Sequence, residues 1–252
     1  MRRIMIAGTN SGCGKTTVTC AVLQALVNRK INVSSFKCGP DYIDPMFHKT
    51  VIGTAAYNLD TYLMSNDAVN YLLNKNSGDI AVIEGVMGFY DGFSFTEKGS
   101  THELSEITDT DVILVVNCRG MSLSAMALVK GFKEFRKNNI KGVIFNNLSE
   151  NMYGNLAEKC RNIGLTPLGF LPNIKDVQIS SRHLGLVTAG EIDGIKDKMN
   201  LLADYAEKYI DIDKILEISE NDRDTKFTSL EITKKYNLKI AVAYDRAFCF
   251  YY

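Results

Sequence analysis

The chain has 252 residues, 46% of them hydrophobic and 23% charged, and its 29 basic and 29 acidic side chains give a formal net charge of zero. This balance is ordinary for a globular protein with a large core, and it gives no reason to expect nucleic acid as a main partner. No apolar run approaches the roughly 18 residues of a membrane span, so no membrane partner is expected. The start, Met-Arg-Arg followed by an apolar run, is unlike a signal peptide. Six cysteines without C-x-x-C pairing predict free thiols in the cytoplasm, with no zinc site and no disulfide framework.

Short apolar runs alternate with longer amphipathic stretches along the chain. The predicted strands are residues 3–7, 32–37, 80–84, 112–117, 142–146 and 167–171. The predicted helices are residues 15–29, 67–74, 101–108, 121–138, 152–163 and 194–209. Runs that are apolar at every position, such as residues 112–116, are typical of parallel strands covered on both faces. The pattern therefore predicts an α/β fold with a doubly wound, mostly parallel sheet, in which ligands bind beyond the C-terminal ends of the strands.

The segment between the first predicted strand and helix reads G-T-N-S-G-C-G-K-T-T from Gly8 to Thr17. Such a strand–loop–helix context predicts a phosphate-binding loop, with Lys15 reaching the outer phosphates and the Thr16 hydroxyl on Mg²⁺. Five residues separate Gly8 from Gly14, where the general motif has four. The alternative is a glycine-rich turn that binds nothing, but such a turn has no need of a lysine. The residues expected to contact a nucleotide are Thr9, Asn10, Ser11, Gly12, Cys13, Gly14, Lys15, Thr16 and Thr17.

The second predicted strand is followed by K-C-G-P-D-Y-I-D-P, from Lys37 to Pro45. The two prolines predict a segment that does not form a regular helix. Asp41 and Asp44 carry the hard carboxylate oxygens that Mg²⁺ prefers, and Lys37 offers a cation for phosphate or a substrate carboxylate. The alternative is a turn with two solvated aspartates. A phosphate loop on a neighbouring strand favours the functional interpretation.

Two acids follow in the segment I-E-G-V-M-G-F-Y-D-G. Glu84 closes a strand, the place from which an acid commonly holds Mg²⁺ beside a phosphate loop. Asp91 is a second acid within reach of the same space. The alternative for Glu84 is a carboxylate that caps a turn, and for Asp91 the two interpretations stay open.

Three later residues are weaker candidates. Asn146 ends a predicted strand, where its amide could read a nucleobase edge or simply form a turn. Arg182 and His183, in S-R-H-L-G-L after the last predicted strand, could bind an anionic substrate or be structural.

The C-terminal part of the chain has a different pattern. Residues 221–226 are polar and lack periodicity, as in a linker, and residues 238–244 form a new apolar run. This run is interpreted either as the first strand of a further domain or as a last edge strand of the main sheet. The first interpretation predicts a domain at residues 1–218, a linker at 219–237 and the start of a truncated domain at 238–252.

These motifs, in this order, resemble the cobyrinic acid a,c-diamide synthases of cobalamin biosynthesis, whose amidating domain is similar to dethiobiotin synthetase and shares the longer phosphate loop. The resemblance runs from residue 3 to about 209 and resumes at 239. It implies an ATP- and Mg²⁺-dependent ligase that amidates the a and c carboxylates of a corrinoid through acyl phosphates. It further implies Thr16, Asp44 and Glu84 at the metal. The other roles that it implies are Lys15, Lys37, Asp41, Asp44, Glu84 and Asp91 in catalysis, Asn146 at the adenine, and Tyr42, Arg182 and His183 at the substrate.

Family members carry a C-terminal glutaminase domain that releases ammonia from glutamine. Only its first strand is expected here, and Cys249 is not expected to be its nucleophile. This chain is therefore not expected to hydrolyse glutamine by itself, and whether it is active with free ammonia stays open. The oligomeric state stays open, with a homodimer among the options.

Three alternatives to this function remain at the level of sequence. The same chemistry on nickel-sirohydrochlorin or hydrogenobyrinic acid would use the same motifs. A partitioning or switch-type P-loop ATPase is a second class, although such a switch has no need of the D-Y-I-D and R-H-L-G-L segments. A chain that binds its ligands without turnover is the third.

Overall fold

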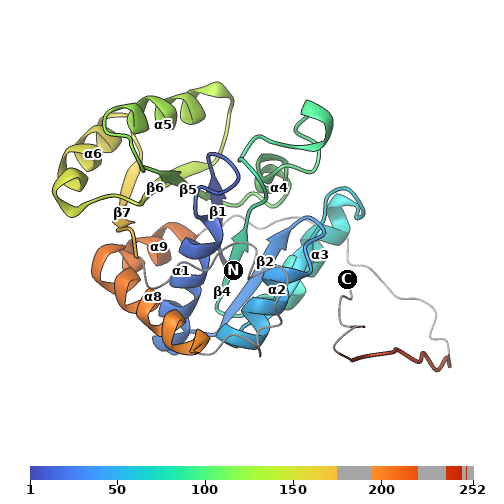
Figure 1. The fold of residues 1–252 in the computed structure, drawn as a ribbon. Coiled ribbons are helices and arrows are strands. Elements are labelled where there is room, and N and C mark those ends of the chain that lie inside the picture. Colours follow the sequence, from blue (N-terminus) through green and yellow to red (C-terminus); the bar gives the residue numbers. More distant parts are fainter. Residues whose placement is uncertain (175–193, 221–236, 246–247, 249–252) are drawn as a thin grey trace.

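The computed structural model describes residues 1–174, 194–220, 237–245 and 248, so the candidates Arg182, His183 and Cys249 lie outside the described residues (Figure 1). Among the described helices, none has both the length and the apolar character needed to cross a membrane. The elements in chain order are β1 (Arg2–Gly8), α1 (Lys15–Asn28), β2 (Val33–Cys38), α2 (Ile43–Phe47), the π-helical turn η1 (His48–Ile52), β3 (Ala55–Leu59), α3 (Asn66–Asn76), β4 (Ile80–Glu84), the 3₁₀ turn η2 (Phe93–Phe95), α4 (Thr101–Ile107), β5 (Val112–Asn117), α5 (Ser124–Phe135), β6 (Ile140–Asn146), α6 (Glu150–Asn162), β7 (Thr166–Leu171), α8 (Ile195–Tyr209) and α9 (Ile212–Ser219).

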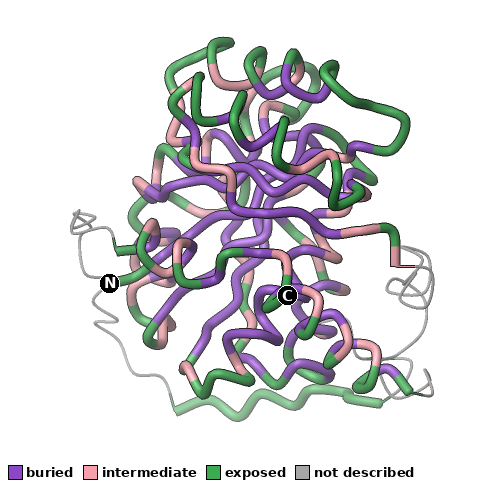
Figure 2. The backbone as a smooth tube through the Cα atoms, turned by 90° about the vertical axis from the view of Figure 1, so that its left-hand side faces the viewer, coloured by how far each residue is buried: buried purple, intermediate pink, exposed green. Residues whose placement is uncertain are grey.

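The described strands form one seven-stranded sheet in the order β3-β2-β4-β1-β5-β6-β7, with all neighbours parallel. Helices α1, α8 and α9 cover one face together with η1, and α3 to α6 cover the other, so the strands between them are buried (Figures 1 and 2). The predicted doubly wound α/β sheet is confirmed. Because β4 and β5 flank β1, the chain after β1 leaves the sheet at its topological switch point, where such folds bind ligands.

All six predicted strands are present with ends within two residues of those predicted, and the six predicted helices have ends within three. The elements that were not predicted are β3, α2, η1, η2 and α9. Strand β3 was not predicted because this edge strand, A-A-Y-N-L, mixes exposed and half-buried positions and lacks an apolar run. Glu84 therefore ends the fourth strand of the chain and not the third.

The expectation that the prolines prevent a helix after β2 is wrong, because Pro45 lies inside α2. The helix begins at Ile43, so Pro45 occupies its first turn, where a backbone N–H would have no acceptor within the helix. The Asp41 carboxylate accepts hydrogen bonds from the backbone N–H groups of Ile43, at 2.8 Å, and Asp44, at 3.2 Å. Asp41 thus supplies an acceptor for these two backbone N–H groups, which have none within the helix.

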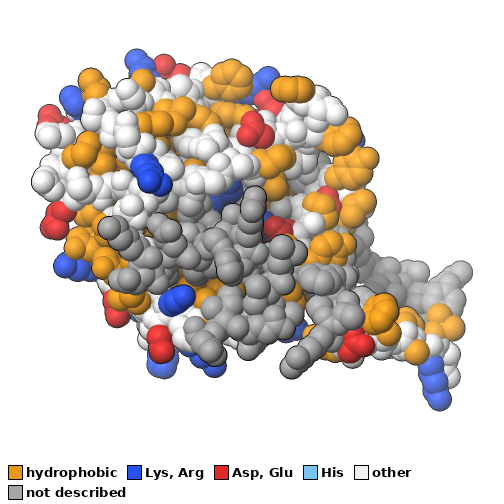
Figure 3. Space-filling model, viewed as in Figure 1, with side chains coloured by type: hydrophobic (Ala, Val, Ile, Leu, Met, Phe, Trp, Pro, Cys, Tyr) orange, Lys and Arg blue, Asp and Glu red, His pale blue; other side chains and the backbone are white. Residues whose placement is uncertain are grey.

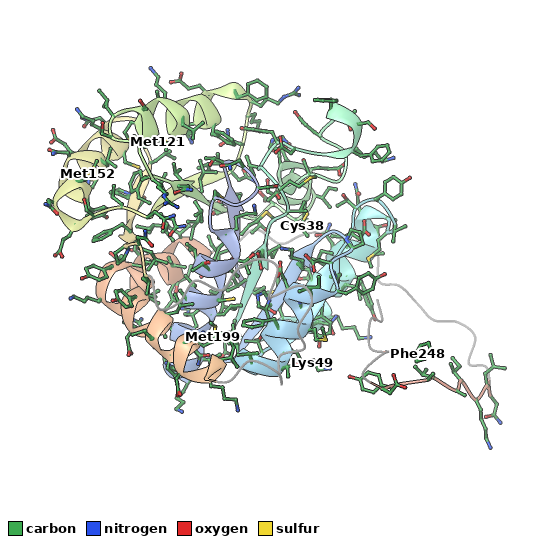
Figure 4. The ribbon with its side chains drawn as sticks, viewed as in Figure 1. Cys38, Lys49, Met121, Met152, Met199 and Phe248 are labelled. Carbon is green, nitrogen blue, oxygen red and sulfur yellow. The ribbon has the colours of Figure 1, made fainter. Side chains whose placement is uncertain are left out.

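The apolar run at residues 238–244 is exposed at every position and forms neither a helix nor a strand. It is not an edge strand of the described sheet, so that alternative is wrong. A strand requires a partner for its backbone hydrogen bonds, and none of the described strands pairs with this segment. Figure 4 shows Phe248, which follows it, apart from the α/β unit. The division into domains stays a prediction.

Five of the six cysteines lie in the described residues, and all five are free and buried, as the sequence analysis predicted: Cys13, Cys20, Cys38, Cys118 and Cys160. Burial raises the pKa of the Cys38 and Cys160 thiols to about 12. These side chains therefore pack as small hydrophobic groups.

The close approach of β7 to the segment after α8 depends on Gly169. Its φ is +122°, and an added Cβ would lie 2.1 Å from the backbone oxygen of Tyr209. We expect Gly169→Ala to lower the free energy of unfolding by about 1–3 kcal/mol, because backbone must move to make room. Gly154→Ala is the control, since Gly154 lies within α6 with open space around its Cα, and it should stabilise by about 0.5–1 kcal/mol. Urea denaturation measures both, and equal stabilities for the two variants would contradict this account.

Candidate active site

The loop between β1 and α1 is folded tightly around its glycines. An added Cβ on Gly8 would lie 2.3 Å from the Cys13 sulfur, and one on Gly14 would lie 1.9 Å from the Asn146 amide nitrogen. Gly14 also has a φ of +99°, and it begins α1 without a side-chain hydrogen bond to the first-turn N–H groups. These donors are the groups that cradle a phosphate at a helix N-terminus. The geometry is that of a phosphate-binding loop.

Asn146 holds this loop from the neighbouring side of the sheet. Its amide nitrogen donates to the backbone oxygen of Cys13 at 2.9 Å, from the C-terminal end of β6. The expected contact with adenine is not tested by this arrangement. The observed contact is one that supports the shape of the loop.

Lys15 links the phosphate loop to the loop that follows β4. Its ammonium donates to the backbone oxygens of Met87, at 2.5 Å, and Asn10, at 3.4 Å. Lys15 is buried, and burial lowers its pKa from the ordinary value, with Lys37 lowering it further and Cys13, Glu84 and Asp44 raising it. Among the described residues, carbonyl oxygens are the hydrogen-bond acceptors of this buried ammonium, and a cation placed in this way is suited to accept an anionic ligand.

Thr16 and Glu84, the residues that the resemblance places at the metal together with Asp44, are joined by a direct hydrogen bond. The Thr16 hydroxyl donates to Glu84 Oε1 at 2.6 Å. Glu84 is fully buried at the end of β4, and Thr16 is in the first turn of α1. The helix and the strand therefore present their oxygens to the same point.

Lys37 lies at the centre of three carboxylates. Its ammonium is 2.5 Å from Asp44 Oδ2, 3.1 Å from Glu84 Oε1 and 3.7 Å from Asp41 Oδ2. The register of the sheet explains the contact with Glu84, since Lys37 on β2 pairs directly with Glu84 on β4. Cys38, labelled in Figure 4, marks the same end of β2. We call Lys37, Asp41, Asp44 and Glu84 the lysine–carboxylate cluster.

Burial and neighbouring charges shift the pKa values of this cluster in opposite directions. Burial lowers the pKa of Lys37, but Glu84, Asp44 and Asp41 raise it by more, so the net shift is upward and Lys37 is an ammonium. The pKa of Asp44 is raised from its ordinary value by burial and by Glu84, against the opposing effect of Lys37. The cluster is a buried, charged arrangement that depends on mutual pairing.

His48 is a site residue that the sequence analysis missed. It is buried, and its Nε2 lies 3.5 Å from Glu84 Oε2. Neither ring nitrogen of His48, nor Glu84 Oε2, has a hydrogen-bond partner among the described residues. Burial lowers the pKa of His48 to about 4, so the ring is neutral. The spacing of His48 four residues after Asp44 was an available signal, but it places both on one face only if the segment is helical.

The remaining candidates are less closely associated with the cluster. Asp91 accepts a hydrogen bond from the Gly88 N–H at 3.0 Å and so closes its own loop. Tyr42 is exposed beside Asp41. The structure therefore brings together Lys15, Thr16, Lys37, Asp41, Asp44 and Glu84, and it adds His48.

Residues 4–187 match the family model described as the CobQ/CobB/MinD/ParA nucleotide binding domain. A protein of Thermoplasma volcanium named cobyrinate a,c-diamide synthase is 44% identical over 99% of this chain and 56% of its own length. A protein of the same name from Methanocaldococcus jannaschii is 41% identical over 100% of this chain and 58% of its own length. The chain thus spans a little over half the length of these curated relatives.

Two solved structures resemble the fold. The cell division protein FtsY of Thermotoga maritima has a TM-score of 0.50 and 15% identity, over 80% of this chain and 68% of its own. The chloroplast FtsY of Physcomitrella patens has a TM-score of 0.52 and 12% identity, over 87% of this chain and 65% of its own. At these identities the likeness concerns the fold alone.

The burial of the lysine–carboxylate cluster makes a prediction about stability. We expect Lys37→Met to lower the free energy of unfolding by about 3–5 kcal/mol, because Glu84 and Asp44 would be left buried without their cation. The control, Lys141→Met, changes an exposed lysine and should stay within about 0.5 kcal/mol of the parent chain. Adding Asp44→Asn and Glu84→Gln to Lys37→Met should recover part of the lost free energy of unfolding, because no carboxylate would then be left without its cation. Urea denaturation curves for Lys37→Met and Lys141→Met that coincide would refute the prediction.

Proposed function

We propose that this chain uses ATP to activate tetrapyrrole carboxylates for amidation. The chain belongs to the CobQ/CobB/MinD/ParA nucleotide-binding domain family, and it matches cobyrinate a,c-diamide synthases over its whole length. The substrate of this proposal is cobyrinate, and the groups converted are its a and c carboxylates. The observation that carries the proposal is the Thr16–Glu84 hydrogen bond, which sets the lysine–carboxylate cluster against the phosphate loop.

The chemistry needs activation because a carboxylate reacting directly with ammonia would have to expel oxide. In the proposed reaction a carboxylate oxygen attacks the γ-phosphorus of ATP, the bond to the β-phosphate oxygen breaks, and ADP leaves. Ammonia then attacks the carbonyl carbon of the acyl phosphate. Inorganic phosphate leaves, and the nitrogen loses a proton to solvent. The protein contributes positioning and charge neutralisation to both steps.

The described residues fit these tasks. The N–H groups that begin α1, together with Lys15, hold the nucleotide phosphates. Lys37 neutralises charge on the transferring phosphoryl group or the substrate carboxylate. Asp91, Arg182 and His183 remain proposals for the substrate, as does Asn146 for adenine.

A Mg²⁺ ion fits the oxygen atoms beside the loop. Thr16, Glu84 and Asp44 offer the hard ligands that this ion takes, and no described residue makes a hydrogen bond to the buried Glu84 Oε2. Among the described residues, no group of three or more His, Cys, Asp or Glu side chains could hold a metal by itself. Phosphate oxygens and water would complete the coordination, as is usual for Mg²⁺. When bound, the ion would neutralise charge on the phosphates.

The nitrogen donor and the cellular compartment are finer parts of the proposal. Ammonia released from glutamine is the proposed donor in the complete enzyme, with residues 238–252 as the proposed start of a glutaminase domain. The five free, buried cysteines are compatible with a reducing cytoplasm.

The direct test incubates the chain with cobyrinate, ATP, Mg²⁺ and ammonium. We expect a product in which each converted carboxyl has exchanged OH for NH₂ by mass spectrometry, with one ADP formed per amide. Lys15→Ala should lower the rate by about 10²–10³-fold, because it removes charge stabilisation of the phosphoryl group. Lys141→Ala, near the N-terminal end of β6, should leave the rate unchanged. Undiminished amidation by Lys15→Ala would overturn the assignment of Lys15 to the phosphates. Turnover of only nickel-sirohydrochlorin or hydrogenobyrinic acid would identify that tetrapyrrole as the substrate in place of cobyrinate.

His48 generates a separate prediction about the metal. Its Nε2 faces the unpaired Glu84 Oε2, so we expect it to position the Glu84 carboxylate for Mg²⁺. His48→Leu should raise the Mg²⁺ concentration for half-maximal activity by about 10–100-fold, the usual cost of losing such a supporting contact. His48→Gln, which keeps an N–H donor, should restore most of this loss. A purely structural role predicts instead that both variants lose stability while their Mg²⁺ requirement stays the same.

A further inference from the structure

Four large apolar side chains are exposed on the β3 side of the candidate site. Tyr62 and Leu63, in the turn after β3, are 60% and 64% exposed, and Phe93 and Phe95, in the loop after β4, are 64% and 110% exposed. We call these four residues the aromatic rim. Figure 3 shows hydrophobic side chains along the right-hand side of the molecule, over the turn before α3 and the loop that contains η2. Apolar residues gathered in this way commonly mark a binding surface.

The two segments of the rim are held together and are not independent loops. The rings of Tyr62 and Phe93 lie 6.0 Å apart between centroids. The Glu103 carboxylate in α4 accepts hydrogen bonds from the Thr61 hydroxyl, at 2.8 Å, and the Gly99 N–H, at 2.6 Å. The rim is therefore a built surface, anchored to the body of the fold through α4.

Phe95 is presented on a strained backbone. Ser94 and Phe95 have φ values of +49° and +60°, the left-handed region that residues other than glycine avoid. This conformation costs about 1–2 kcal/mol per residue. No burial of the Phe95 ring offsets that cost, because the side chain is fully exposed. Strain retained in this way is typical of ligand-binding sites.

The rim and the lysine–carboxylate cluster lie at the same edge of the sheet. Strands β3, β2, β4 and β1 are neighbours in that order, so their C-terminal ends lie along one edge of the sheet. The loop that carries Phe93 and Phe95 begins at Glu84 and passes through Met87, whose backbone oxygen accepts from Lys15. A large ligand on the rim is therefore at the same edge of the sheet as the phosphate loop.

A cation borders this apolar surface. The ammonium of Lys98 lies 5.5 Å from the centroid of the Tyr62 ring. Lys98 is exposed and has no acidic partner among the described residues, whereas the adjacent Glu97 is paired with Arg136 and faces His102. The rim therefore combines flat apolar groups with an uncompensated positive charge.

We propose that the aromatic rim binds one face of the tetrapyrrole macrocycle, with Lys98 pairing to a peripheral carboxylate that is not being converted. The proposal rests on the proposed function, which requires a large ring with apolar faces and carboxylates at its edge. Aromatic side chains stack on such a face, and the neighbouring carboxylate then extends to the cluster beside the phosphate loop. The rim is a specificity surface for the ring, separate from the groups that handle phosphate.

The test compares two rim substitutions with one control, whose exposure matches that of Phe93. Phe95→Ser and Phe93→Ser remove rim side chains, and Phe135→Ser removes a phenylalanine that is 65% exposed at the end of α5. Spectroscopic titration of cobyrinate should give a Kd at least about tenfold higher for the rim variants, equivalent to about 1.4 kcal/mol. The KM for cobyrinate should rise in parallel, while the Kd for ATP and the KM for ammonium stay as in the parent chain. Phe135→Ser should resemble the parent in all four measurements.

Lys98 tests the charged part of the proposal. Lys98→Met should weaken cobyrinate binding, and this loss should shrink at high salt because exposed charges are screened. Lys98→Arg should bind as the parent chain does. Equal affinity of Lys98→Met and the parent at low salt would overturn the pairing.

The outcomes separate this proposal from the proposed function. If the parent chain amidates cobyrinate but Phe95→Ser and Phe93→Ser keep its Kd and KM, the rim proposal is wrong and the proposed function stands. If the parent neither binds nor amidates cobyrinate, both fail. If the rim variants change the sedimentation coefficient while their KM is unchanged, the rim is instead a contact between copies of the chain, and the proposal is overturned.

Discussion

The contact on which the rest of the site depends is the buried pair of Lys37 and Glu84, 3.1 Å apart on adjacent strands. Taking both charges out of water is costly, so the arrangement persists only if every charge is compensated. Asp44 supplies the second carboxylate at 2.5 Å, and α2 must therefore sit against the end of β2. The Thr16 hydroxyl meets Glu84 from α1. The contacts that compensate these buried charges thus hold β2, β4, α1 and α2 together at a single point.

The phosphate loop is held from both sides of β1. The Asn146 amide supports it from β6, and the Lys15 ammonium reaches the loop after β4 through the Met87 oxygen. These contacts exist because β1 lies between β4 and β5 in the sheet, and because β6 follows β5. The loop therefore has a defined shape before any phosphate binds, which lowers the entropic cost of binding. This preorganisation suits a site whose proposed work is positioning.

The surroundings of the site divide into two kinds of surface. The lysine–carboxylate cluster is buried and charged, which suits the transfer of a phosphoryl group away from water. The aromatic rim beside it is exposed and apolar, and Phe95 is held there on a backbone of positive φ. Charge chemistry and recognition of a large ring make opposite demands on solvent exposure. The fold meets both by placing them on successive loops at the same edge of the sheet.

The sequence by itself determined the phosphate loop, six of the seven described strands and the candidate site residues at the ends of those strands. Local patterns of glycine and apolar residues specify these features. The sequence did not reveal that Pro45 lies within α2, since whether a helix begins at Ile43 depends on its packing against β2. It did not reveal His48 as a neighbour of Glu84, or that Asp91 closes its own loop. The contact of Asp91 with Gly88 is local to its loop. Only the tertiary structure decided the contact of His48 with Glu84, because the strand order and the β2–β4 register bring together segments that are far apart in the chain.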